Sequence, residues 1–382
     1  MKNTFQVSKK EQDKIIASLD GRNDPESQRI KRYLNMPDLS RKIGSPIAEM
    51  VERILARPEF KDFDVIETPE VVPQSISFDL FDFPKDHPAR SKSDTYYLNE
   101  ENILRTHTTV MWYYYLNEKD VKERMSKGEA VGCFSFGKVY RKDEIDRNHM
   151  NVFHQLDGWY LAPKAKENIG VEELKKVLNA IADAIFGTQM ERRFNPDDFP
   201  YTDPSIEMEI KPADKWIEVL GSGVVKGSVL DKLGVDSTKW NGWAFGFGLE
   251  RLAIVSMELP DIRLLWSEDE RVRKQLKLGT KFKEVSKFPP VLRDISFVAS
   301  KNLVLNTYFD RIRDIVGDQI EEMKLTDKYE NDNKFGTDRQ SYTWRLTYRD
   351  LNRTLTNEEV NALHVRVEEM TEEEFGGEIR RQ

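Results

Sequence analysis

A predicted β-hairpin in the middle of the chain groups side chains that could bind a nucleotide. The stretches 130–140 and 151–161 are typical of two strands, because apolar residues dominate both and a polar loop separates them. Every second side chain of a strand points to the same face. Phe153, Gln155 and Asp157 should therefore project together, placing an aromatic plane, an amide and a carboxylate in one location.

The first strand and the loop of this hairpin add charged groups. Arg141 ends the first strand, Asp143 follows two residues later, and His149 lies in the connecting loop, RKDEIDRNHM. A guanidinium can clamp a phosphate, a carboxylate can accept from an adenine amino group, and a phenyl face can stack on a base. Each residue alone fits an ordinary surface hairpin with solvated charges; the combination favours a nucleotide site.

A glycine-rich stretch, GWAFGFGLER, is the second candidate for binding an anion. Gly242, Gly246 and Gly248 precede an expected helix that has Arg251 near its start. Glycine lets a backbone approach a ligand closely, and a helix N-terminus favours negative charge. The spacing differs from a dinucleotide-binding GxGxxG turn. The alternative is a tight strand-to-helix turn in which Arg251 pairs with Glu250 or another neighbour.

Composition excludes several classes of protein. The 382 residues suggest two or three domains, and 38% hydrophobic with 33% charged residues is typical of a soluble globular chain. The single cysteine, Cys133, excludes a disulfide framework or a cysteine-based zinc site, and the five histidines lack metal-ligand spacing. A net charge of −8 argues against nonspecific coating of nucleic acid but allows a local basic surface.

The end of the chain predicts a separate small domain. Residues 276–286 are polar and basic, and Pro289 and Pro290 follow them. Beyond this boundary the pattern predicts strands at 291–299, 319–329 and 340–349, helices at 304–316 and 357–374, and a short strand at 378–381. The order βαββαβ is that of a ferredoxin-like domain.

Several of these segments resemble the class II aminoacyl-tRNA synthetases. KVYRKDEIDRNHMNVFHQLDG resembles the second signature motif of the class, GWAFGFGLERLA the third, and FDVIETPEVV the weaker first motif. FDLFDFPKDHPARSKSDTYYL, LRTHTTVMW and WIEVLGSGVV resemble the catalytic chain of the phenylalanyl-tRNA synthetases. The tail, with KFPPVLRDISF and YTWRLTYRDLNRTLTNEEVNALH, resembles their ferredoxin-fold anticodon-binding domain. A single chain holding both parts is the layout of the mitochondrial form.

The resemblance implies an α+β protein in four parts. We expect a helical extension over residues 1–60 and, over 61–275, a catalytic domain built on an antiparallel β-sheet with flanking helices. A linker over 276–286 and a ferredoxin-like anticodon-binding domain over 287–382 should follow.

The resemblance also assigns site residues. For ATP it assigns the α-phosphate to Arg141, the adenine amino group to Asp143, the β- and γ-phosphates to His149, the adenine ring to Phe153 and Arg251, close backbone approach to Gly248, and Mg²⁺ or ribose to Glu218. For phenylalanine it assigns the ammonium group to Gln155, with Asp157 beside it, the pocket lining to His107 and Thr109, and aromatic walls to Trp243 and Phe245. Arg141 and Arg251 would be the catalytic residues. Two positions depart from the family pattern: Asp157 replaces a glutamate, and Trp112 replaces a polar residue.

The predicted anticodon-binding domain has basic residues on its strands. Residues 286–356 hold 12 Lys and Arg against 11 Asp and Glu, whereas 357–382 hold 3 against 8. The candidates for tRNA contact are Arg293, Lys328, Arg345 and Arg349. The aromatic residues Phe297, Tyr342, Trp344 and Tyr348 are candidates for stacking on anticodon bases, and the alternative is that they form the domain core.

The function implied is the ATP-dependent charging of tRNA(Phe) with L-phenylalanine through a phenylalanyl-adenylate, with Mg²⁺. The alternatives are a non-catalytic tRNA-binding protein and a paralogue that activates another amino acid. Both ATP-site arginines and the anticodon-binding tail argue against them. We expect a monomer, as in the single-chain relatives, although most class II enzymes dimerise. We expect a cytoplasmic protein because the first residues show no presequence pattern, with the mitochondrial matrix as the alternative.

Overall fold

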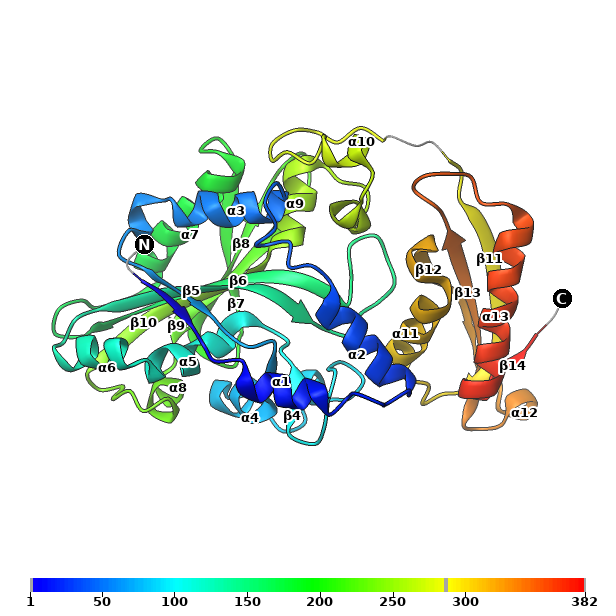
Figure 1. Ribbon diagram of the computed structural model, residues 1–382, viewed down its shortest axis with the longest axis horizontal. Helices are drawn as coiled ribbons and strands as arrows, with labels where there is room; N and C mark the ends of the chain where they lie inside the picture. The colour runs from blue at the N-terminus through cyan, green and yellow to red at the C-terminus, as the bar shows by residue number, and fades with distance from the viewer. Residues whose placement is uncertain (1–2, 285–287, 381–382) are drawn as a thin grey trace. The chain divides into compact units, whose positions relative to one another are not determined.

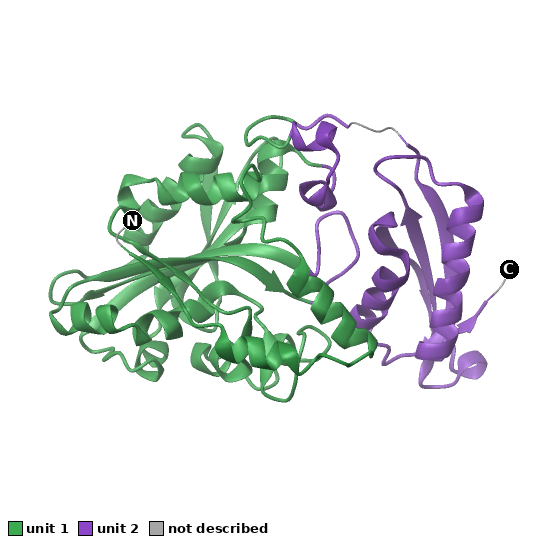
Figure 2. Ribbon diagram, in the orientation of Figure 1, with its two compact units in different colours: residues 1–141, 152–259, 276–281 green, residues 142–151, 260–275, 282–382 purple. Residues whose placement is uncertain are grey.

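A computed structural model describes residues 3–284 and 288–380. The chain forms two compact units (Figure 2). Unit 1 comprises residues 1–141, 152–259 and 276–281, and unit 2 comprises 142–151, 260–275 and 282–382. The expected linker at 276–286 extends into residues 285–287, which lie outside the described residues.

Unit 1 is built on a large β-sheet. Among the described residues its order is β1 (Thr4–Gln6), β2 (Asp64–Glu67), β5 (Val131–Tyr140), β6 (Val152–Pro163), β10 (Trp240–Gly248), β9 (Ile217–Val225), β8 (Thr202–Ile210) and β7 (Arg192–Asp197). The pairs from β5 to β7 are antiparallel, whereas β1 and β2 join in parallel. A small antiparallel pair, β3 (Val71–Pro73) and β4 (Asn102–Leu104), lies outside this sheet. The N-terminal segment, expected as a helical extension, thus supplies an edge strand as well as helices.

Helices cover both faces of this sheet (Figure 1). On one side lie α3 (Pro46–Leu55), α7 (Val171–Phe186) and α9 (Leu249–Met257), which contact one another. On the other side lie α4 (Gln74–Ser77), α5 (Met111–Asn117), α6 (Lys119–Ser126) and α8 (Gly227–Lys232). The other helices are α1 (Lys10–Ala17) and α2 (Pro25–Asn35). Capping residues set several helix starts: the Asp24 carboxylate accepts the Ser27 N–H, and the Ser45 hydroxyl accepts the Ile47 N–H.

The strand register decides which side chains share a face. Asp157 of β6 lies opposite Ser135 of β5 and Gly246 of β10, and Gln155 lies opposite Gly248. We call the face to which Gln155 and Asp157 point the front face, and the opposite one, which contains His154, the back face. Part of the front face is covered by α5, whose Trp112 stacks on Trp159 with ring centroids 4.6 Å apart.

Unit 2 has the predicted ferredoxin-like order. It contains β11 (Val291–Ser300), α11 (Leu305–Val316), β12 (Ile320–Tyr329), β13 (Arg339–Tyr348), α13 (Asn357–Phe375) and β14 (Glu378–Ile379), with the short helices α10 (Glu270–Arg273) and α12 (Asp332–Phe335). The sheet order is β12-β13-β11-β14. The four aromatic residues considered for base stacking, Phe297, Tyr342, Trp344 and Tyr348, are at most 5% exposed and belong to the core of this unit. The core interpretation is correct, and the stacking interpretation is wrong for them.

Two segments differ from the expectation drawn from sequence. The glycine-rich stretch before α9 is not a loop; it forms the central strand β10, and the helix begins only at Leu249. The loop between β5 and β6 belongs to unit 2, where Ile145 joins the core and its carbonyl accepts the Met323 N–H at 3.0 Å. Within the described residues, no helix has both the length and the apolar character needed to cross a membrane.

Candidate active site on the front face of the sheet

Asp157 and Gln155 form the floor of the candidate site. They come from alternate positions of β6, and glycines face them on β10. A Cβ at Gly246 would lie 2.6 Å from Oδ1 of Asp157, a distance too short for two non-bonded heavy atoms. Glycine is therefore required at this position so that the carboxylate can lie against the neighbouring strand.

The Asp157 carboxylate is buried and half-satisfied. Its Oδ2 accepts a hydrogen bond from Thr109 Oγ1 at 2.5 Å, but Oδ1 has no partner among the described residues. Burial raises the pKa of Asp157 to about 6, against the opposing effect of the Thr109 hydrogen bond. Oε1 of Gln155 is likewise buried without a partner in the described part of the chain. Buried acceptors without partners cost free energy, so this pair is suited to receiving donors from a ligand.

An aromatic pocket adjoins Asp157. The side chains of Phe199 and Tyr201 enter it from the segment before β8, and Trp112 enters from α5. The Phe199 and Tyr201 rings are roughly parallel, at 22°, with centroids 6.1 Å apart. The full lining is Thr109, Trp112, Asp157, Phe199, Tyr201, Gly221, Ser222, Ala244, Phe245 and Gly246. A pocket with aromatic walls and one carboxylate matches a ligand that has an aromatic ring and a positive charge.

The sequence analysis missed Phe199 and Tyr201. The signal available was the pair of aromatic residues flanking Pro200 in DDFPYTDP, directly before a predicted strand. It was assigned instead to Trp243 and Phe245, which the structure places elsewhere. Trp243 stacks with Phe63 and Tyr160 at centroid distances of 5.8 and 5.6 Å, on the back face.

The Phe245 ring is also directed to the back face. It lies over Gly158, because residues opposite each other on β6 and β10 share a face. Phe245 still contributes to the lining of the pocket. The structure therefore does not bring the Trp243 ring to Gln155 and Asp157, and the aromatic walls there come from other elements.

His107 lies beside the pocket residue Thr109 but is directed elsewhere. Its Nε2 donates to the Ser77 carbonyl oxygen at 3.0 Å, and its ring packs near Phe81 and Phe83. Burial, with the nearby Arg141 charge, lowers the pKa of His107 to about 3, so the ring is neutral. Nδ1 has no partner among the described residues. The ring can therefore accept a hydrogen bond at Nδ1 but cannot supply charge.

Arg141 and Phe153 lie together at the open end of the hairpin. The guanidinium carbon of Arg141 is 5.2 Å from the centre of the Phe153 ring, and its Nε donates to the Thr106 carbonyl oxygen at 3.0 Å. The cation thus occupies one face of the ring that was assigned to adenine. The Phe153 ring also lies near Gly248, where an added Cβ would be 4.0 Å from Cδ2.

Arg251 is paired with Glu218 instead of stacking on Phe153. Its Nη1 is 3.8 Å from Oε2 of Glu218, and both side chains are about half exposed. Burial raises the pKa of Glu218, and the nearby Glu207 adds to this shift, whereas Arg251 opposes it. The two sides of the expected adenine sandwich are therefore present, but in this structure a carboxylate occupies Arg251 and Arg141 occupies Phe153.

Asp143 and His149 belong to unit 2. Nδ1 of His149 is 2.8 Å from Oδ2 of Asp146, and this hydrogen bond raises the pKa of His149. The Asp143 carbonyl oxygen accepts from Arg313 at 3.0 Å. Their assigned contacts with ATP remain predictions.

The four basic residues assigned to tRNA have different surroundings. Arg293 donates to Asn361 and Asn357 of α13 at 2.9 and 2.8 Å. Arg345 makes two 2.8 Å hydrogen bonds to Asp294, and Arg349 lies 2.6 Å from the buried Glu321. Lys328 is exposed on β12. Only the last of these therefore presents its charge without a listed structural role in the sheet or helix contacts named above.

Within the described residues, no group of three or more His, Cys, Asp or Glu side chains is arranged to hold a metal ion. Glu218 alone cannot form a complete metal site. Mg²⁺ is commonly held by one or two carboxylates together with substrate phosphates. The acidic surroundings of Glu218 fit that kind of shared site.

Comparisons with known proteins cover both parts of the chain. The family described as "tRNA synthetases class II core domain (F)" matches residues 34–276, and the "Ferredoxin-fold anticodon binding domain" matches residues 286–380. The chloroplastic/mitochondrial phenylalanine–tRNA ligase of Arabidopsis thaliana is 38% identical, with 81% of this chain and 71% of that protein covered. The mitochondrial enzyme of Mus musculus is 37% identical, covering 85% and 76%, and that of Saccharomyces cerevisiae is 32% identical, covering 81% of each. Domain matches in the right order and relatives of this similarity agree with the fold and the front-face site, and the chain belongs to the phenylalanine–tRNA ligase family of class II aminoacyl-tRNA synthetases.

Proposed function

We propose that this chain charges tRNA(Phe) with L-phenylalanine and that the front face of unit 1 binds the amino acid. The observation on which this rests is the pair of buried, unpartnered acceptors on Gln155 and Asp157 beside an aromatic pocket. An α-ammonium group can donate to both acceptors. The phenyl ring then extends between Phe199, Tyr201 and Trp112, where no polar ligand group is required.

Thr109 and His107 have supporting roles in this proposal. The Thr109 hydroxyl fixes one oxygen of Asp157, so the other stays directed at the ligand. The neutral His107 offers Nδ1 as an acceptor next to the site. The aspartate is one methylene shorter than a glutamate, and its reach to the ammonium is set by the close contact with Gly246.

ATP is proposed to bind next to the amino acid, at Phe153, Gly248 and Arg251. Adenine displaces the Arg141 guanidinium from the Phe153 ring, and Arg251 leaves Glu218 to cover the other face of the base. The released Arg141 is then free to contact the α-phosphate. Asp143 and His149 are proposed to contact the adenine amino group and the outer phosphates.

The chemistry is acyl transfer in two steps. The phenylalanine carboxylate attacks the α-phosphorus of ATP in line, the bond to the β-phosphate oxygen breaks, and pyrophosphate leaves. A terminal hydroxyl of the tRNA then attacks the acyl carbon of the adenylate, loses its proton, and AMP leaves. Arg141 and Arg251 stabilise the charge that develops on the phosphate oxygens, so positioning and electrostatics do the catalysis. Mg²⁺ arrives with ATP, and Glu218 is the proposed carboxylate ligand.

Unit 2 is proposed to read the anticodon, with Lys328, Arg293, Arg345 and Arg349 as the candidate contacts. Single-stranded bases are commonly bound by exposed charge and stacking. We also propose a monomer. The named relatives are organellar enzymes, which supports the mitochondrial matrix over the cytoplasmic location expected from the sequence.

ATP–pyrophosphate exchange, measured with each of the twenty amino acids, tests the function. Exchange that depends on phenylalanine, followed by charging of tRNA(Phe), is the expected result. Exchange with a different amino acid would indicate a paralogue. A complete lack of exchange, with tRNA binding retained, would indicate a non-catalytic tRNA-binding protein.

A further inference from the structure

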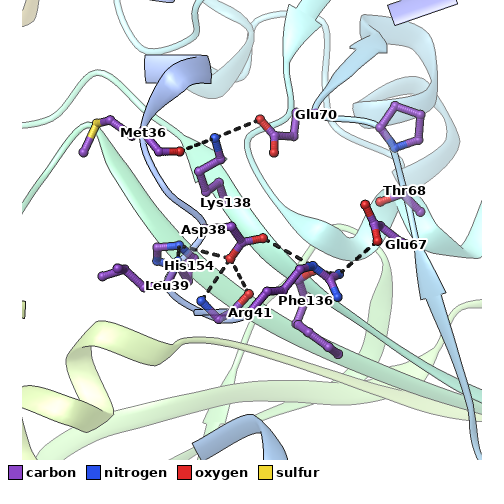
Figure 3. A network of polar contacts seen from close by, with 12 residues as sticks. Met36, Asp38, Leu39, Arg41, Glu67, Thr68, Glu70, Phe136, Lys138 and His154 are labelled. Carbon is purple, nitrogen blue, oxygen red and sulfur yellow. Dashed lines mark hydrogen bonds and ion pairs between the residues drawn. The ribbon is translucent and has the colours of Figure 1, made fainter. Parts of the chain in front are cut away.

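A polar network on the back face lies directly behind the proposed ATP site (Figure 3). Its centre is His154, which lies between Phe153 and Gln155 in β6 but points the opposite way. The His154 side chain is fully buried, and a carboxylate lies near each ring nitrogen. A fully buried ring with polar partners on both sides is costly unless its contacts hold something in place.

The first carboxylate belongs to Glu250, the residue before Arg251. Oε1 of Glu250 is 2.6 Å from Nδ1 of His154, where the ring donates its proton. The backbone N–H of His154 also donates to this carboxylate, at 2.8 and 3.0 Å from its two oxygens. The pairing of β6 with β10 ends at Gln155 and Gly248, so Glu250 takes the place of the next strand partner. One side chain of α9 therefore continues the sheet pairing past the turn at Gly248.

The other ring nitrogen of His154 faces the segment after α2. Nε2 is 2.9 Å from the backbone nitrogen of Leu39 and 3.3 Å from Oδ1 of Asp38. Lys138, opposite His154 on β5, donates to the carbonyl oxygens of Leu34 and Met36, each at 2.8 Å. The back face of the hairpin thus holds residues 34–39 through two side chains, as Figure 3 shows for Met36, Asp38 and Leu39.

We propose that His154 and Glu250 are positioning residues for ATP. Their double link fixes the start of α9 against β6 and so sets the separation between Arg251 and the Phe153 ring that receives adenine. The inference rests on the nucleotide site proposed above. It assigns to the contacts of Nε2 with residues 38–39 a role in stability only.

Amide substitutions of His154 separate the two links. In His154→Asn the amide can reproduce the hydrogen-bonding position of Nδ1, so the contact with Glu250 is kept and that with Asp38 and Leu39 is lost. In His154→Gln the longer amide can reproduce Nε2, so the opposite contact is kept. Glu250→Ala removes the link from the other side.

The test is ATP–pyrophosphate exchange with the full chain, measuring KM for ATP and for phenylalanine, with a melting temperature for each variant. His154→Gln and Glu250→Ala should raise the KM for ATP by about tenfold or more, as expected for a lost hydrogen bond to a charged group, and leave the KM for phenylalanine within about twofold. His154→Asn should restore an ATP KM close to that of the wild type. Lys138→Met is the matched control, because it loosens residues 34–39 and should lower the melting temperature without changing the KM for ATP.

Equal ATP KM values for His154→Asn and His154→Gln would overturn the inference, as would a loss that follows the melting temperature in all variants, Lys138→Met included. Arg251→Ala in the same assay separates this failure from a failure of the proposed site. If Arg251→Ala raises the KM for ATP and His154→Gln does not, only the positioning role is wrong. If Arg251→Ala has no effect, the nucleotide site itself is wrong.

Discussion

The two faces of the β5–β6 hairpin treat buried polar groups in opposite ways. On the front face, Ser135, Gln155 and Asp157 each have a buried oxygen without a partner among the described residues. On the back face of the same strands, Lys138 and His154 have partners for the groups they present. Because an unpartnered buried acceptor costs free energy, the front face is built for a ligand and the back face for rigidity. Function and stability are thus separated by the alternation of side chains along one hairpin.

The largest effect is expected from Gln155→Leu. The substitution keeps the approximate volume but removes the acceptor proposed for the ammonium group, and hydrogen bonds to charged groups contribute about 1.5–3 kcal/mol. The kcat/KM for phenylalanine in pyrophosphate exchange should therefore fall by about 10- to 150-fold, with an unchanged melting temperature. A variant that keeps full activity would remove Gln155 from the site and break the comparison between the two faces.

Gly246→Ala should have the next largest effect. The new methyl group would lie 2.6 Å from Oδ1 of Asp157 and must displace the carboxylate. We expect kcat/KM for phenylalanine to fall by about tenfold or more, as for a lost hydrogen bond to a charged group. Gly170→Ala is the matched control, because the nearest atom to its Cβ is 3.5 Å away and belongs to the flexible Glu173 side chain. Equal activity of the two variants would show that Asp157 has no fixed position in the site.

The pH dependence of Asp157 has opposite signs for binding and stability. Burial raises the pKa of Asp157 from 3.8 to about 6, so the charge that attracts an ammonium is lost as the pH falls through about 6. Phenylalanine should bind more weakly at pH 5 than at pH 7. The free energy of unfolding without ligand should change the other way, falling by up to about 3 kcal/mol between pH 4 and pH 7, because the folded state binds the proton more tightly.

Asp157→Asn should remove both dependences, as seen by titration calorimetry and by denaturant unfolding at each pH. Persistence of either pH dependence in this variant would assign it to another group. The measurement sharpens the comparison, since no back-face group needs to titrate for the amino acid to bind.

The smallest effect is expected from Ser135→Ala on the front face. The Ser135 hydroxyl is buried without a partner in the described part of the chain, so removing it should leave the free energy of unfolding unchanged or raise it by up to about 1 kcal/mol. Lys138→Met on the back face should lower it by about 3 kcal/mol or more, because it removes a buried cation whose partners then remain unsatisfied. A destabilisation by Ser135→Ala as large as that of Lys138→Met would contradict the division of the two faces.

The sequence was sufficient where a simple period fixes the geometry. Alternation along 151–161 placed Phe153, Gln155 and Asp157 on one face, and the order of elements predicted the ferredoxin-like unit. It failed where the face depends on a strand partner. Trp243 and Phe245 were assigned to the pocket because β10 was not expected to be a strand in register with β6.

Other features depend on contacts between distant segments. Phe199 and Tyr201 lie in a short irregular segment with no period, so only the folded chain brings them to Asp157. The link from Asp38 to His154 joins positions more than a hundred residues apart. The inclusion of Ile145 in the core of unit 2 has no local signal in a charged loop.

Titration calorimetry of L-phenylalanine with the full chain tests the central claim most directly, by comparing two neighbouring residues of one strand. Gln155→Leu, which changes the front face, should weaken phenylalanine binding by about tenfold or more. His154→Asn, which changes the back face, should leave the affinity within about twofold of the wild type. If Gln155→Leu binds phenylalanine as tightly as the wild type, or if both variants lose affinity equally, the front face is not the amino-acid site and the account is wrong.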